Sequence, residues 1–417
     1  MRFSSRVPSN LEPNPWAARL ASRRAAGASL LDLTEANPTR TGLAPETPAS
    51  RARWSDAALG RYAPDPRGDE AARGAIAAYY RDRGLRAEPD AIVLTASTSE
   101  AYAHLFRMLA DPGETVLVPR PSYPLFVPLA RAEGVTVISY PLSYDGSWHV
   151  DLDELERAIG PRARAVVVVQ PNHPTGSCLE AAEQAGLDAL AARRGLAVIS
   201  DEVFGDFPWP RLPGRGAQRS PDAETTATHA EDGAAKPLHA PGLPSLIGER
   251  EAPTFVMSGL SKVCGLPQMK ASWIAVTGPR AARDAALERL EWLADLFLSV
   301  SAPAQRALPV WLAERHAFQR RVHERLASGL ARLELACARA PALSLMPGTG
   351  GWVAVLKLPG RRSEEAWALD LLDRDVMVHP GHFYDFDSEP FLVVSLIVEP
   401  GTLDRGLTRL EELVAAS

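Results

Sequence analysis

The chain contains four lysines, at positions 236, 262, 270 and 357, among 45 basic residues. Two of them, Lys262 and Lys270, lie in one short segment that begins at Ser258. An arginine guanidinium stays protonated and cannot form a Schiff base, whereas the amine of a desolvated lysine can. A chain that uses arginine for nearly every other cation therefore predicts a carbonyl-binding role for Lys262. The alternative is that two surface lysines remain by chance.

Pyridoxal phosphate (PLP) is the carbonyl compound that best fits such a lysine, and it needs further partners. An acid must pair with its pyridinium nitrogen so that the ring can accept electrons. Asp201 directly follows the apolar run 196–200, and a carboxylate at a buried strand end needs a cation, which the pyridinium would supply. The alternative is that Asp201 caps the N-terminus of a helix.

Two more segments could hold the phosphate and the ring of PLP. Residues 95–100 join a predicted strand to a predicted helix, so the amides and hydroxyls of Thr98 and Ser99 could bind a phosphate. The same residues also form an ordinary capping box. Tyr123, between two prolines, offers a ring to stack on the pyridine, although a lone tyrosine often only packs. The prolines of segment 170–176 predict an irregular loop after another strand.

Short apolar runs rich in valine and isoleucine recur between helix-like segments. They cover residues 91–95, 115–118, 135–140, 165–169, 196–200, 254–258 and 273–277. Runs of this kind are typical of strands buried on both faces of a mostly parallel sheet, and helical patterns such as 100–109 and 183–193 lie between them. We therefore expect an α/β fold whose ligand lies at the carboxyl ends of the strands.

We expect a large domain over residues 41–300 and a smaller α+β domain over 301–417, with residues 1–40 packed on the small domain. Residues 216–242, rich in Pro, Gly, Ala and Thr, are predicted to form a mobile surface insertion. A helical region is expected over 279–315. Strands at 352–358, 376–379 and 391–397 and a helix at 402–415 are expected in the small domain.

Composition excludes several classes of function. The net charge of −6 gives no basic surface for nucleic acid or an anionic membrane, and no apolar stretch is long enough to span a bilayer. The three cysteines are scattered and show no metal-binding or disulfide spacing. The N-terminus lacks the apolar run of a signal peptide. We expect a cytoplasmic protein without a metal site.

The order and spacing of these motifs resemble the aspartate aminotransferase family, the class I/II aminotransferases of fold type I. The likeness covers nearly the whole chain except the insertion, and it runs through Asn37-Pro-Thr, Tyr62, Gly68, Tyr123, Pro171–Gly176, Asp201-Glu-Val, Ser261-Lys262 and Pro380-Gly381. It implies a seven-stranded sheet and a homodimer in which Tyr62 reaches the phosphate of the neighbouring subunit. It also implies transfer of an amino group between an amino acid, or an amine, and a 2-oxo acid.

Carried over residue by residue, the resemblance assigns further contacts and shows departures. Ser261 is assigned to the cofactor and Asn37 to the substrate. His173, with Asn172 before it, stands where the family has an asparagine that donates to the phenolic oxygen of PLP. Phe204 replaces a tyrosine that donates to the same oxygen, so the Schiff-base pKa should rise unless His173 compensates. Lys270 replaces a phosphate-binding arginine.

One departure concerns the substrate. Family members carry an arginine near the last strand of the small domain that clamps the substrate carboxylate. This chain has neither arginine nor lysine from Asp375 to Asp404. Arg40 is our first candidate for a replacement, with Arg120 next. The weaker candidates are His379 and His382, and each of the four could instead be an ordinary surface residue.

Three functions are compatible with these residues. An aminotransferase is the leading interpretation, with Lys262 as the general base. The missing arginine favours a second, in which the same cofactor serves a β-lyase, racemase, decarboxylase or synthase. A non-catalytic, cofactor-binding regulator is the third, and the intact Lys262 and Asp201 argue against it.

Overall fold

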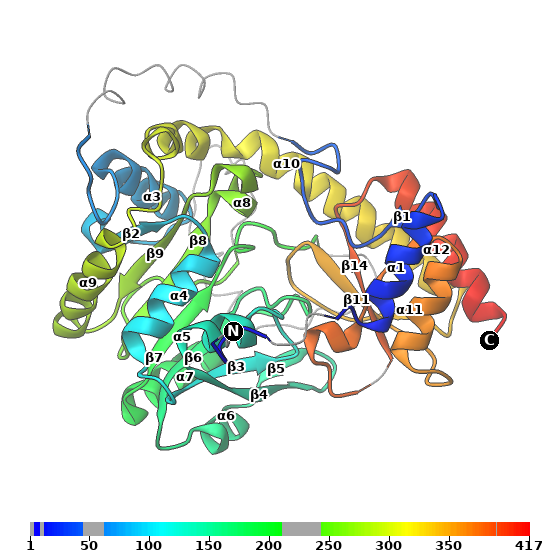
Figure 1. The fold of residues 1–417 in the computed structure, drawn as a ribbon, viewed down its shortest axis with the longest axis horizontal. Coiled ribbons are helices and arrows are strands. Elements are labelled where there is room, and N and C mark those ends of the chain that lie inside the picture. Colours follow the sequence, from blue (N-terminus) through cyan, green and yellow to red (C-terminus); the bar gives the residue numbers. More distant parts are fainter. Residues whose placement is uncertain (1–3, 9–11, 45–61, 211–242, 389) are drawn as a thin grey trace, which may run out of the picture.

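The computed structural model describes residues 4–8, 12–44, 62–210, 243–388 and 390–417. Its centre is an eight-stranded sheet in the order β2-β9-β8-β7-β6-β3-β4-β5 (Figure 1). The strands are β2 (Ile92–Thr95), β3 (Thr115–Arg120), β4 (Thr136–Tyr144), β5 (Trp148–Val150), β6 (Ala163–Val169), β7 (Ala197–Asp201), β8 (Thr254–Gly259) and β9 (Ser272–Thr277). From β8 to β4 all neighbours pair in parallel, whereas β9 and β5 run antiparallel to their neighbours. The seven expected strands are present, and the short β5 is an eighth.

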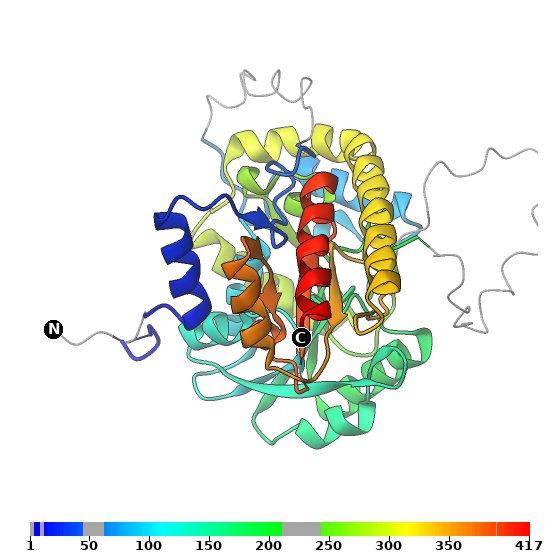
Figure 2. The same ribbon diagram turned by 90° about the vertical axis from the view of Figure 1, so that its right-hand side faces the viewer.

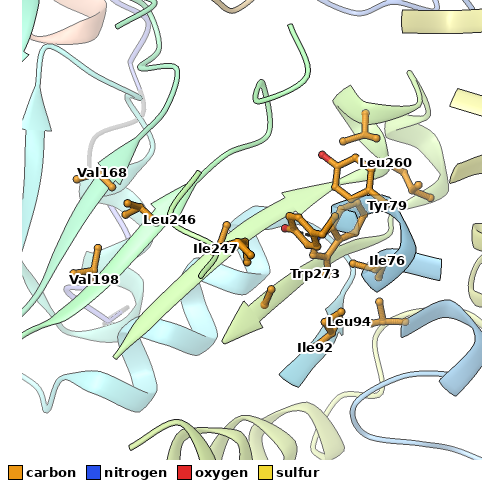
Figure 3. Packing of buried hydrophobic residues seen from close by; sticks show 14 of the residues in the cluster. Ile76, Tyr79, Ile92, Leu94, Val168, Val198, Leu246, Ile247, Leu260 and Trp273 are labelled. Carbon is orange, nitrogen blue, oxygen red and sulfur yellow. Dashed lines mark hydrogen bonds between the residues drawn. The ribbon is translucent and has the colours of Figure 1, made fainter. Parts of the chain in front are cut away.

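Helices cover both faces of this sheet. Side chains of α3 (Glu70–Asp82), α7 (Ala181–Arg194) and the beginning of α10 (Ala302–Arg339) pack into the core on one face. Those of α4 (Thr98–Leu109), α5 (Phe126–Glu133) and α9 (Arg280–Asp295) pack into the core on the other. In β6, Val166 and Val168 lie in the first core and Val167 in the second, and Figure 3 shows part of the first core. The expectation of strands buried on both faces is confirmed.

A smaller four-stranded sheet has the order β10-β11-β14-β13. Its strands are β10 (Ser344–Leu345), β11 (Val353–Lys357), β13 (His379–Pro380) and β14 (Phe391–Ser395). The helices α11 (Glu364–Asp373) and α12 (Pro400–Ala415) and the later part of α10 pack on one face of it. α10 runs from the large sheet to the small one and contributes to both cores (Figures 1 and 2). The predicted domain boundary at residue 300 stays a prediction.

The N-terminal segment contacts both parts of the molecule. Arg131 of α5 donates to Ser5 O at 3.0 Å, whereas residues 15–32 lie beside elements of the smaller part. The helix α1 (Pro15–Ala25) lies beside α11 (Figure 2), and Arg19 forms an ion pair with Asp373 at 2.5 Å. The strand β1 (Leu31–Asp32) pairs in parallel with β12 (Val376–Met377). Residues 376–379, expected as one strand, are therefore divided between β12 and β13.

The expected helical region over 279–315 is two helices. α9 ends at Asp295, Leu298 has a positive φ of 44°, and α10 begins after Ser301 with a proline in its first turn. A positive φ is unfavourable for a leucine and cannot continue a right-handed helix. The insertion at 216–242 lies outside the described residues. The remaining helical elements are α6 (Leu152–Ala158), α8 (Leu260–Val263), η3 (Pro89–Ala91), η5 (Pro267–Met269) and η6 (Gly381–Tyr384).

None of the helices in the described ranges combines the length and the apolar character required to cross a bilayer.

Candidate active site

The predicted cofactor residues lie where neighbouring strands of the large sheet end. Asp201 is the last residue of β7, and Lys262 lies in α8, directly after β8. Tyr123 follows β3, and His173 follows β6. Because β8, β7, β6 and β3 are adjacent and parallel, their carboxyl ends lie along one edge of the sheet. The fold therefore brings these four residues to the same edge.

Lys262 is half-buried against aromatic rings. Its Nζ lies 5.3 Å from the centroid of the Phe204 ring and 5.0 Å from that of Trp352. Burial lowers the pKa of Lys262 to about 8, and the carboxylate of Asp201 opposes this shift. A lysine with this pKa has an appreciable neutral fraction near pH 7, so its amine can act as a nucleophile and as a base.

Asp201 is a buried carboxylate held by neutral donors. Its Oδ1 accepts a hydrogen bond from the backbone N–H of Val203 at 3.2 Å, and its Oδ2 accepts one from the Tyr102 hydroxyl at 3.1 Å. Burial raises the pKa of Asp201 to about 6, and both hydrogen bonds oppose this shift. The chain after Asp201 forms a turn, so the alternative of a helix N-cap is excluded. A buried carboxylate with only neutral donors suits a cationic ligand such as a pyridinium.

Asn172 and His173 have different environments. The Oδ1 of Asn172 accepts from the Ser122 hydroxyl at 2.8 Å, and its Nδ2 donates to Pro121 O and Thr175 Oγ1, so this amide joins its own loop to the loop after β3. The His173 ring stacks on Phe204 with centroids 5.9 Å apart. Burial, followed by the nearby charge of Lys262, lowers the pKa of His173 to about 3. His173 is therefore a neutral ring at the edge that holds Lys262, and it can donate one hydrogen bond.

The first turn of α4 contains Thr98 and Ser99, the residues predicted to bind a phosphate. Ser97 caps the helix by accepting from the N–H of Glu100 at 3.1 Å, and Glu100 accepts from the N–H of Ala96 at 2.6 Å. Only the Ser97 half of a capping box is formed, because Glu100 accepts from the residue before the cap and not from Ser97 N–H. Thr98 and Ser99 lie in the first turn, where N–H groups lack intrahelical partners.

The three remaining residues assigned to the phosphate are less enclosed. Ser261 precedes Lys262 in α8 and is half-buried. Lys270 is exposed and has a left-handed conformation with φ 51° directly after η5. Tyr62 leaves 86% of its surface exposed. The single chain does not enclose Lys270 and Tyr62.

The candidates for a substrate-binding cation already have partners. Arg40 pairs with Glu35 at 3.3 Å and leaves 73% of its side chain exposed, and Asn37 accepts from Thr39 N–H at 3.0 Å. Arg120 pairs with Asp387 at 2.5 Å. Two histidines were the weaker candidates: His379 Nδ1 lies 3.0 Å from the Tyr384 hydroxyl, and His382 Nδ1 lies 3.1 Å from Glu364 Oε1.

The strand β14, where the family arginine was expected, is apolar and buried. Val393 lies in a cluster with Tyr384, Met346 and Val355, and it is paired in register with His379. The ring of Tyr384 contacts that of His173 edge-on, with centroids 5.4 Å apart. This apolar cluster therefore extends to the cofactor edge of the large sheet.

Sequence reasoning missed three aromatic residues at this site, namely Tyr102, Trp352 and Tyr384. Tyr102 could have been found, since it lies one turn after Thr98 on the same helix. The other two come from the small domain, and no spacing along the chain connects them with Lys262.

Comparison with known proteins shows the family. The model of "Aminotransferase class I and II" matches residues 50–410. Glutamate-pyruvate aminotransferase AlaA of Escherichia coli is 27% identical over 245 residues, which cover 58% of this chain and 54% of the relative. Human tyrosine aminotransferase is 32% identical over 43% of this chain and 40% of the relative. The chain thus spans about half the length, or less, of these curated relatives.

Solved structures agree on the fold. An alanine aminotransferase from Pyrococcus furiosus superposes with a TM-score of 0.80 at 22% identity, covering 100% of both chains. An aminotransferase from Escherichia coli has a TM-score of 0.79 at 21% identity and covers 100% of this chain and 98% of its own. The fold predicted from the sequence is confirmed. By the match of the family model, the chain belongs to the class I and II aminotransferases, which depend on PLP.

Proposed function

We propose that this chain is an aminotransferase that moves an amino group between an amino acid, or an amine, and a 2-oxo acid. The observation that carries the proposal is the pairing of Lys262 and Asp201 at the carboxyl ends of two neighbouring strands. Asp201 is buried and Lys262 is half-buried, and burial shifts the pKa of each in the direction that favours its neutral form. A lysine that can be neutral and a carboxylate that requires a cation are the two groups that PLP needs.

The residues present fit this cofactor. Bound PLP would supply an electron-accepting ring that stabilises negative charge at the substrate α-carbon. Lys262 would hold the aldehyde group, and its amine could remove and return a proton at the substrate α-carbon. Asp201 would accept a hydrogen bond from the ring nitrogen, and Tyr123 would support the face of the ring. His173 would donate to the phenolic oxygen in place of the family asparagine.

The phosphate is assigned to residues that surround the same edge of the sheet. The first-turn N–H groups of α4 and the hydroxyls of Thr98, Ser99 and Ser261 provide neutral donors, and Lys270 provides the charge. A helix N-terminus favours an anion, which supports this assignment. These donors would keep the cofactor bound when it is not attached to Lys262.

For the substrate, we propose that Arg40 binds the carboxylate and that Asn37 lines the entrance. Among the described residues, the exposed guanidinium of Arg40 is paired with Glu35, and a surface ion pair of this kind is weak. A substrate carboxylate can therefore displace Glu35 at small cost.

We also propose a homodimer located in the cytoplasm. Tyr62 is exposed on one copy, consistent with a contact to the phosphate of the neighbouring subunit. Trp292, Leu296 and Phe297, at the end of α9, leave 65%, 55% and 54% of their surfaces exposed, which is typical of an interface. The cysteines Cys178, Cys264 and Cys337 are not joined in disulfides, which suits a reducing compartment.

A spectroscopic titration tests the proposed function. The purified protein with PLP should show the visible absorbance of a lysine-bound cofactor. This band should bleach with an amino donor and return when a 2-oxo acid is added. A band that persists while ammonia or another product accumulates would indicate a different PLP reaction. The absence of a visible band after PLP is added would show that the proposed function is wrong.

A further inference from the structure

We propose that Tyr102 is a positioning residue for the cofactor: its hydroxyl fixes the Asp201 carboxylate and thereby keeps the shared proton on the cofactor nitrogen. The inference rests on the proposed function. It adds a residue that the motif-by-motif resemblance did not assign.

The geometry around Asp201 supports this role. The Tyr102 hydroxyl donates to Oδ2 at 3.1 Å, and the Val203 N–H donates to Oδ1 at 3.2 Å, so each carboxylate oxygen has one donor. Tyr102 is 0% exposed and Asp201 is 6% exposed. Two donors on opposite oxygens fix the rotation of the carboxylate, because a turn about its last bond would break both hydrogen bonds.

The phenol is itself held rigidly. The Tyr102 ring packs edge-on against Phe126 of α5, with centroids 5.4 Å apart, and against Phe106 of its own helix, with centroids 5.6 Å apart. Phe126 also packs edge-on against Tyr123 at 5.6 Å. The ring that would stack on the pyridine and the phenol that holds Asp201 therefore share one aromatic support.

The helix α4 carries both Tyr102 and the residues proposed to bind the cofactor phosphate. Thr98 and Ser99 lie in the first turn of α4, and Tyr102 lies one turn later. Residues four apart on a helix are on the same face. One rigid helix therefore presents the phosphate donors and the partner of Asp201, so the separation between these two contacts is set by helix geometry.

The electrostatic consequence follows from the groups that face Asp201. Burial raises the pKa of Asp201, neighbouring Glu202 raises it further, and the Tyr102 hydrogen bond and the charge of Lys262 lower it. Tyr123 also interacts with this carboxylate. Removing the Tyr102 hydroxyl makes the carboxylate more basic, so the proton between it and the pyridine nitrogen moves toward Asp201. The ring then becomes a weaker electron acceptor.

The test compares Tyr102→Phe with Tyr140→Phe. Tyr140 is a matched control, because it is also 0% exposed and its hydroxyl donates to a buried backbone oxygen, that of Val167, at 2.8 Å. Both variants are loaded with PLP labelled with ¹⁵N in the ring, and the nitrogen resonance is measured along with the PLP dissociation constant and kcat.

We expect Tyr102→Phe to move the ¹⁵N resonance toward that of an unprotonated pyridine and to lower kcat by about 10- to 100-fold, the range for loss of a hydrogen bond to a charged group. Tyr140→Phe should leave the ¹⁵N resonance unchanged. An unchanged resonance in Tyr102→Phe, or equal changes in both variants, would overturn the inference while leaving the proposed function intact. Failure of the wild type to bind PLP would overturn both.

Discussion

The two sides of the candidate site differ in how completely this chain builds them. On the large-domain side, Lys262, Asp201 and His173 are partly or wholly buried, and burial shifts the pKa of each. On the small-domain side, β14 contributes apolar Val393 to a buried cluster, and the basic candidates already have partners. The residues proposed to bind the cofactor thus lie together in one chain, whereas no unpaired cation is seen among the candidates for binding the substrate carboxylate. The family resemblance extends further for the cofactor than for the substrate.

The largest effect should come from Lys262→Ala on the cofactor side. The variant should lose covalent attachment of PLP, and kcat should fall by at least about 10³-fold, because both the nucleophile and the base are removed. Borohydride reduction followed by peptide mass spectrometry would locate the attachment. Lys270→Ala is the matched control and should retain the modification on Lys262. A modified peptide without Lys262 would contradict the proposal.

Asp201→Asn should lower kcat by about 10²- to 10³-fold, since the amide cannot stabilise a protonated ring nitrogen. Its neighbour Glu202 provides the contrast. That carboxylate accepts from Ser245, from the N–H of Leu246 and from Gln170, so it has a structural role. Glu202→Gln should reduce the free energy of unfolding by about 1–3 kcal/mol and leave the cofactor absorbance unchanged. If Asp201→Asn only reduced stability and Glu202→Gln lowered kcat, Glu202 and not Asp201 would be the partner of the cofactor nitrogen.

Capture of PLP should depend on pH with a midpoint near the Lys262 pKa. Only the neutral amine attacks an aldehyde, and burial lowers this pKa from 10.5 to about 8. The capture rate should therefore rise about tenfold per pH unit below pH 8 and level off above it. Stopped-flow absorbance from pH 6 to about 10.5 measures this. A rate that continued to rise past pH 10 would show an unperturbed lysine.

On the substrate side, Arg40→Ala should raise KM for a carboxylate-bearing donor by about tenfold, with unchanged PLP binding. Arg86→Ala is the matched control, since Arg86 is also an exposed arginine that pairs with a nearby acid, Glu88. Glu35→Gln should lower KM modestly, because it frees Arg40 from its partner. Steady-state kinetics with one donor would compare the three variants. Unchanged kinetics in Arg40→Ala would show that Arg40 does not bind the substrate carboxylate.

The smallest effect is expected for His173→Ala. The neutral His173 ring is proposed to donate to the phenolic oxygen, and its loss should raise the pKa of the lysine-bound cofactor by about one unit. A spectrophotometric pH titration measures this pKa. If the variant titrates like the wild type, His173 makes no such contact. Asn172→Ala should instead destabilise the loop, because the Asn172 amide makes three hydrogen bonds there.

The sequence by itself determined the order of the large-sheet strands along the chain and the two residues at their ends that carry the proposal. Apolar runs without alternating polar residues identify strands that are covered on both faces, and the scarcity of lysine identifies Lys262. These signals are local, since each is contained within a few neighbouring residues. The helical region expected over 279–315 is present, but it is divided into α9 and α10, and its break, which includes the positive φ of Leu298, was not foreseen.

Tertiary structure decided which polar groups have partners. Asn172 and His173 are adjacent in sequence, yet the amide of the first bonds mainly to Pro121 and Ser122 in the loop after β3, and the second faces Phe204 and Tyr384. Tyr102 meets Asp201 across 99 positions of sequence. Hydrogen bonds and burial depend on segments that are distant along the chain, so only the folded molecule shows which side chains remain available for chemistry.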